Sequence, residues 1–154
     1  MNALAPLPFP AETALLDRCD RLVVWSFRHW IVGFSDQRHW SLVWRELSRR
    51  FGRNMASEGV TALSAVVRTI CGHARRNVTY HQPCCPCLAA DEYRIVAFIA
   101  ACRQGEWARA EGLAEWIVAQ DGVGDLVAAG TQLVRAMEVR AATPLPEDAT
   151  LALH

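Results

Sequence analysis

The chain contains no lysine: its sixteen basic residues are all arginines, and sixteen acidic residues balance them. Genome composition is the simplest cause of the missing lysine, so we attach no function to it. A chain with no net charge lacks a global field that would attract nucleic acid or an anionic membrane surface. Nucleic acid is therefore a weakly supported partner, and we expect a protein partner instead. The sequence does not indicate an oligomeric state.

Long apolar runs are also missing. The two most apolar stretches, residues 22–34 and 95–101, are too short to span a bilayer, and Arg28 and His29 interrupt the first one. Residues 1–10 lack the positive start and the apolar run of a signal peptide, and their three prolines predict an extended lead-in. We therefore expect a cytoplasmic protein that makes no membrane contact.

Several catalytic motifs are absent as well. The sequence has no glycine-rich phosphate loop, no nucleophile elbow and no His-Glu-x-x-His zinc-peptidase motif. The glycines at residues 122–124 follow no strand, so they do not form a dinucleotide fingerprint. Whether the chain is an enzyme is left open by these absences, and we favour a role that is not enzymatic.

Helical periodicity extends over nearly the whole chain. Apolar residues make up 52% of the sequence and recur at intervals of three and four, whereas no alternating strand pattern competes with them. We predict a single all-α domain over residues 11–140, a compact bundle of about six helices, followed by a flexible tail at 141–154. The expected helices cover residues 11–34, 36–51, 57–72, from about 91 to 103, 106–118 and 125–139.

A cysteine-rich loop is expected between the third and fourth helices. Three thiols, Cys84, Cys85 and Cys87, fall within four residues, and His81 precedes them. Thiolate sulfur and imidazole nitrogen are the ligands that zinc, iron and copper(I) prefer. Thiols stay reduced in the cytoplasm, so this grouping favours metal binding or redox chemistry over a disulfide framework.

Zinc is the metal that we expect first. Cys84 and Cys87 form a C-x-x-C pair, and His81 would be a third ligand to a tetrahedral zinc ion. Either Cys71 or His73 would supply the fourth, because residues two apart on a helix point to opposite sides. Such a site would have a structural or sensory and regulatory purpose, and it would tie the third helix to the fourth.

Three alternatives remain open. An iron–sulfur cluster could use Cys85 together with Cys71, Cys84 and Cys87. A dithiol redox enzyme, a reductase or peroxidase, would use Cys84 and Cys87 as its catalytic pair. In a metal-free helical adaptor, the cysteines would only pack as small apolar side chains.

One tripeptide occurs twice. The sequence Arg-His-Trp at residues 28–30 recurs at 38–40, on what we expect to be neighbouring helices. His29 and His39 could bracket a haem or a metal ion between apolar tryptophans. We favour the more common arrangement, in which such histidines are half-buried and make one hydrogen bond.

Overall fold

The structure of the protein is a computed structural model that describes residues 12–138. The described chain has a 3-10 turn, η1 (Thr13–Leu15), and six helices, which are α1 (Arg18–Gly33), α2 (Arg38–Phe51), α3 (Arg53–His73), α4 (Ala90–Gln104), α5 (Trp107–Ile117) and α6 (Gln120–Glu138). No strand occurs among these described residues, so the predicted all-α bundle is confirmed. The predicted lead-in (1–10) and tail (141–154) lie outside the described residues.

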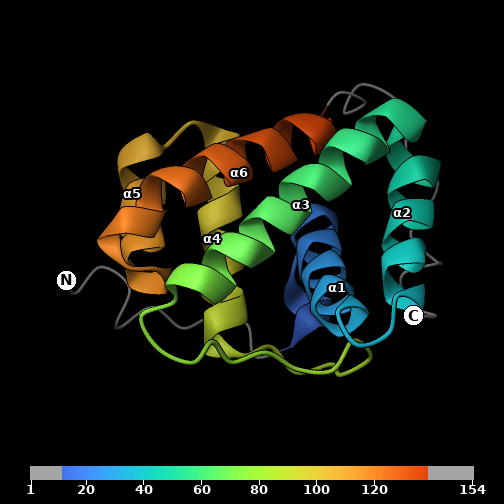
Figure 1. Cartoon of the computed structure of the whole chain (residues 1–154), viewed down its shortest axis with the longest axis horizontal. Coiled ribbons are helices and arrows are strands. Elements are labelled where there is room, and N and C mark those ends of the chain that lie inside the picture. Colours follow the sequence, from blue (N-terminus) through green and yellow to red (C-terminus); the bar gives the residue numbers. More distant parts are fainter. Residues whose placement is uncertain (1–11, 139–154) are drawn as a thin grey trace.

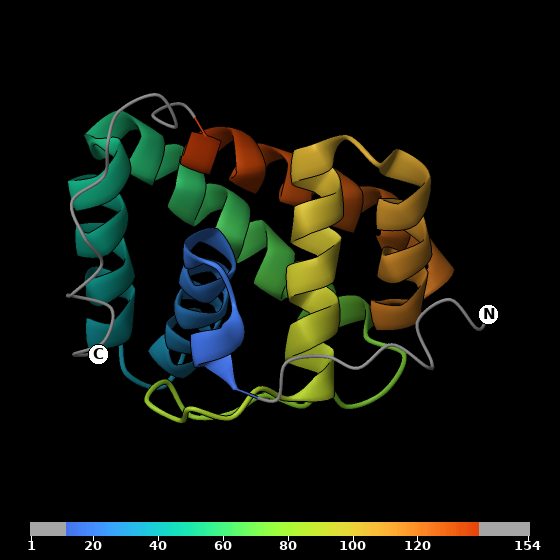
Figure 2. The same cartoon turned by 180° about the vertical axis from the view of Figure 1, so that it is seen from behind.

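The helices form two layers. Helices α3 and α6 pack along each other in one layer, and the other layer places α2, α1, α4 and α5 side by side in that order (Figures 1 and 2). One continuous apolar core lies between the layers, and its most buried members include Val43, Phe98 and Leu126. Within residues 12–138, none of the helices combines the length and the apolar character needed to cross a membrane.

The third and sixth helices start earlier than predicted. Helix α3 begins at Arg53, directly after Gly52, and not at the polar pair near residue 57. Gly52 does end α2 as predicted, and its φ of 83° is the left-handed value that glycine tolerates best. Helix α6 begins at Gln120 and not at residue 125. Gly122 lies inside this helix, where an added Cβ would meet the side chain of His73.

The first helix, in contrast, starts later than predicted. Residues 13–15 form η1, and α1 begins at Arg18, where the side chain of Asp17 accepts a hydrogen bond of 2.8 Å from the backbone N–H of Asp20. A short acidic side chain at this position satisfies one of the helix's unpaired donors. Asp17 therefore sets the start of α1, although the apolar pattern extends further toward the N-terminus.

Gly33 lets the second helix pack closely against the first. A Cβ atom added at Gly33 would overlap the indole ring of Trp40. The same indole donates a hydrogen bond of 2.9 Å from its Nε1 to the carbonyl oxygen of Trp30. The absence of a side chain at Gly33 is therefore a condition for the contact between α1 and α2.

We expect Gly33→Ala to lower the free energy of unfolding by about 1–3 kcal/mol, because Trp40 must move out of its place. Gly112→Ala is the matched control: no atom lies within 4 Å of its added Cβ. That substitution should instead stabilise α5 by about 0.5–1 kcal/mol. Urea denaturation measures both, and a stabilising effect at both positions would contradict the close packing at Gly33.

Candidate functional site

The cysteine-rich loop, residues 74–89, joins α3 to α4. It runs along one edge of the molecule, from the end of α3 past α1 and back to the start of α4 (Figures 1 and 2). Its backbone is hydrogen-bonded at both ends, to the end of α5 through Arg75 and to η1 through Pro86. The loop is therefore attached to the bundle by its main chain as well as by side chains.

A buried arginine of α1 binds the backbone of the loop. Arg28 of α1 is 2% exposed and forms a bidentate ion pair with Glu92, with Nε 2.6 Å from Oε2 and Nη2 2.8 Å from Oε1. Its Nη1 also donates to the carbonyl oxygen of Cys85 at 2.7 Å, and its Nη2 to that of Cys87 at 2.6 Å. The charge on α1 thus fixes the backbone of two of the three thiol-bearing residues.

Glu92 joins the same network from α4. Its side chain is 1% exposed and accepts hydrogen bonds from the backbone N–H of Ala89 at 2.9 Å and of His81 at 3.3 Å. A carboxylate in the first turn satisfies unpaired donors and is favoured by the helix dipole. Glu92 therefore caps α4, holds the loop at two points and balances the charge of Arg28.

Asp91 holds the first half of the loop. It accepts hydrogen bonds from Arg76 (2.5 Å), from the backbone and hydroxyl of Thr79 (2.8 and 3.0 Å) and from Arg94 (2.9 Å). Burial opposes the ionisation of Asp91, but the hydrogen bonds from Thr79 and the charge of Arg76 outweigh it and lower the pKa. This stabilisation is present above the ordinary carboxyl pKa and is lost as the pH falls through the lowered value.

The three loop thiols lie at or near the surface. Cys84 and Cys87 are exposed and Cys85 is half-buried. A hydrogen bond and the charge of Cys85 raise the pKa of the Cys87 thiol, and the nearby Glu12 adds to this effect while Arg28 opposes it. Cys85 is therefore the neighbour that most affects Cys87, and the pair of Cys84 and Cys87 that the C-x-x-C spacing indicates stays a prediction.

The raised pKa bears on the chemistry of Cys87. The thiolate is the nucleophilic form of cysteine, and a raised pKa lowers its fraction at neutral pH. A thiol near the start of a helix usually has a lowered pKa. The pKa of Cys87 is shifted in the opposite direction, and Cys85 is the largest cause.

The upstream candidates lie apart from each other. Helix α3 extends through His73, so Cys71 and His73 point to different sides as predicted. His73 turns toward α6, with its Nδ1 3.3 Å from Oδ1 of Asp121. Cys71 is exposed and lines an apolar cavity of about 240 Å³ together with Tyr80 of the loop.

The predicted four-ligand set is not gathered in one place. Over residues 12–138, no group of three or more His, Cys, Asp or Glu side chains is arranged as metal ligands. His81 is half-buried, and its backbone N–H is bound to Glu92. Of the six predicted ligands, Cys85 and Cys87 are held together by their carbonyl bonds to Arg28, and zinc binding stays a prediction.

Sequence reasoning missed the two residues that organise the loop. Arg28 and Glu92 are separated by 64 positions, so no local spacing connects them. A signal for Arg28 was present, because a charged residue interrupts the apolar face of α1 between Phe27 and Ile31. A charge at such a position requires a buried partner.

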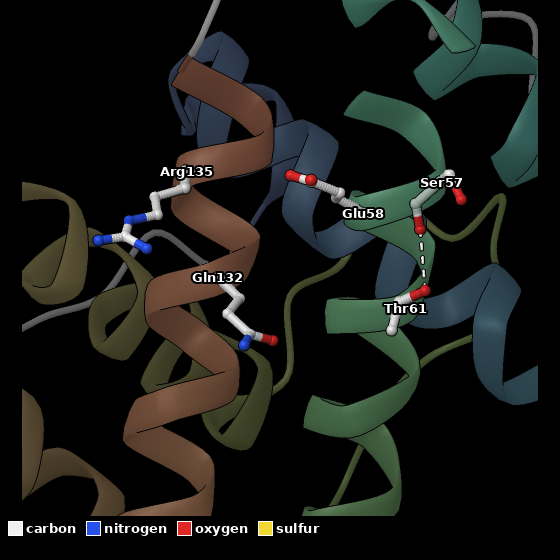
Figure 3. A pocket seen from close by; sticks show the side chains of 5 residues that line it. All are labelled: Ser57, Glu58, Thr61, Gln132 and Arg135. Atoms are coloured by element: carbon white, nitrogen blue, oxygen red, sulfur yellow. Dashed lines mark hydrogen bonds between the residues drawn. The ribbon is translucent and has the colours of Figure 1, made fainter. Parts of the chain in front are cut away.

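A second cavity, of about 360 Å³, lies between α3 and α6 (Figure 3). It is lined by Ser57, Glu58, Thr61, Gln132 and Arg135, all of them exposed. Thr61 uses its hydroxyl to donate to the carbonyl oxygen of Ser57 at 2.9 Å, a bond within its own helix. This cavity therefore offers solvated side chains and no buried group directed at a ligand.

Comparison with known proteins adds no assignment: no family model matches the chain, and no curated protein or solved structure is significantly similar to it. The function must therefore be argued from the cysteine-rich loop and its supports.

Removing either member of the buried ion pair should be costly. We expect Glu92→Gln and Arg28→Met each to lower the free energy of unfolding by about 3–5 kcal/mol, because each leaves a buried charge uncompensated. The control is Arg38→Met, which removes the exposed ion pair with Asp36 and should leave stability nearly unchanged. Urea denaturation measures all three, and equal effects at Arg28 and Arg38 would contradict the role of burial.

Proposed function

We propose that the chain is a regulatory helical protein that binds a thiophilic metal ion through the cysteine-rich loop. Zinc is the ion that we expect. The observation that supports this most directly is that Arg28 binds the backbone carbonyls of both Cys85 and Cys87, which holds these two cysteines close together on the loop. Zinc requires further ligands, and Cys84 and His81 lie on the same loop. Metal binding would then draw Cys84 and His81 toward Cys85 and Cys87.

The supports of the loop favour sensing over a structural role. A structural zinc ion usually organises a segment that is unfolded without it. Here Arg28, Asp91 and Glu92 already fix the loop through hydrogen bonds to its backbone and side chains. We therefore expect a protein that folds without metal and changes only locally when the ion binds.

A dithiol redox enzyme is the second candidate, and the closeness of Cys85 and Cys87 on Arg28 favours it. One thiolate would attack a small-molecule disulfide such as oxidised glutathione and release one thiol. The other cysteine would then displace the bound half, forming a Cys85–Cys87 disulfide and releasing a second thiol. Two electrons and two protons pass from the cysteines to the substrate.

Metal titration of the reduced chain tests the proposal. We expect about one zinc ion per chain in competition with a chromogenic chelator. Cys85→Ser and Cys87→Ser should each lower the affinity by at least about tenfold, the smallest loss typical even of an outer-sphere partner. Cys19→Ser, which changes a half-buried thiol on α1, is the matched control and should leave affinity unchanged.

The competing outcomes are distinct. Circular dichroism of the metal-free chain should keep its helical signal, and unfolding on chelation would show a structural site instead. A zinc affinity in both serine variants equal to that of the unmodified chain would contradict binding at the loop. Absence of zinc binding, with formation of a Cys85–Cys87 disulfide by oxidised glutathione, would favour the redox enzyme. A brown, iron-containing protein would point to an iron–sulfur cluster.

A further inference from the structure

The two Arg-His-Trp tripeptides meet in space. His29 of α1 and His39 of α2 lie with their rings 5.0 Å apart, and their Nδ1 atoms are separated by 2.8 Å. The tryptophans that follow them also contact each other, with Trp30 and Trp40 ring centroids 5.3 Å apart. The repeated sequence thus forms a double contact between α1 and α2.

The short distance between the two Nδ1 atoms limits the number of protons that the two rings can carry together. A neutral imidazole carries one N–H, whereas the charged form is a donor at both nitrogens. A hydrogen bond between the Nδ1 atoms of His29 and His39 needs one donor and one acceptor, so at least one ring must be neutral. Two charged rings would place two N–H donors, and two positive charges, against each other.

The surroundings stabilise one positive charge on the histidine pair. Asp36, in the connection between the helices, has Oδ2 3.9 Å from Nε2 of His39. Hydrogen bonds from Arg38 hold the pKa of Asp36 at about 2, so it stays ionised near neutral pH. A charged His39 can therefore face Asp36 with one nitrogen and donate to His29 with the other.

Among the described residues, the other charged groups on the surrounding elements have partners of their own. They are Arg28 of α1 with Glu92 of α4, Glu46 of α2 with Arg49 and Arg50, and Arg68 of α3, which bonds Ser64 and lies over the ring of Phe34. His29 itself is 3% exposed, so a second charge there is poorly hydrated.

We propose that His29 and His39 form a pH-sensitive latch between α1 and α2. The latch holds while one imidazole is neutral, and it releases the start of α2 when both rings are protonated. Release separates Trp40 from Trp30 and exposes an aromatic surface that is covered at neutral pH. This inference is independent of the metal site.

The sign follows from proton linkage. The unfolded chain protonates both histidines below about pH 6.5, whereas the latched protein accommodates one proton on the pair. The unfolded or opened state therefore binds one proton more. Each unit of pH below about 6 should reduce the equilibrium constant for the closed state by a factor approaching ten.

Nitrogen-15 NMR of the full chain, with a chelator present, follows the latch directly. The indole N–H of Trp40 donates to the carbonyl oxygen of Trp30, and Trp40→Phe identifies its signal. We expect this signal to lose its hydrogen-bonded position between pH 7.5 and 5. His39→Asn should flatten the transition, because its amide offers a donor and an acceptor near the Nδ1 position but does not titrate.

Two further measurements complete the test. His81→Asn, which changes a histidine on the cysteine-rich loop, should keep the full transition. Ring nitrogen shifts of the unmodified chain should show one charged and one neutral imidazole in the pair at intermediate pH, a result that needs no variant to fold. Simultaneous titration of both rings, or an unchanged transition in His39→Asn, would overturn the latch.

Discussion

The buried ion pair between Arg28 and Glu92 is the interaction on which the arrangement of the cysteine-rich loop depends. It joins α1, α4 and the cysteine-rich loop at one point, and both side chains are almost completely excluded from water. Burying two charges removes their hydration, and the attraction between them offsets this only when further hydrogen bonds complete the arrangement. Here the carbonyls of Cys85 and Cys87 and the amide of Ala89 supply those bonds.

This arrangement contributes to geometry more than to net stability. An apolar pair of similar size often folds equally well, but it cannot hydrogen-bond a loop backbone. Arg28 places the carbonyls of Cys85 and Cys87 against α1, so these two residues are held from the inside while Cys87 remains exposed. A loop held in this way keeps the thiol of Cys87 at the surface.

The sequence allowed the bundle to be predicted but not its polar contacts. Apolar periodicity identified six helices, because each helix buries one continuous face. The start of α6 was misplaced since glycine near a helix end resembles a turn, whereas Gly122 is needed for its packing against His73. The Arg28–Glu92 pair joins residues distant in the sequence, and only the assembled fold brings them together. The repeated tripeptide was placed on neighbouring helices, but the contact between His29 and His39 was not predicted, and His29 is buried where a half-buried histidine was expected.

Helix α1 therefore makes polar contacts in two directions from consecutive residues. Adjacent residues on a helix project about 100° apart, so Arg28 reaches the loop and α4 while His29 reaches α2. Apolar packing tolerates small shifts of a helix, but a bidentate ion pair and a hydrogen bond of 2.8 Å do not. The position of α1 is set from both sides, and the backbone of the thiol pair follows it. Because Arg28 and His29 are adjacent on α1, the contact with α2 and the support of the cysteine-rich loop share one short segment of this helix.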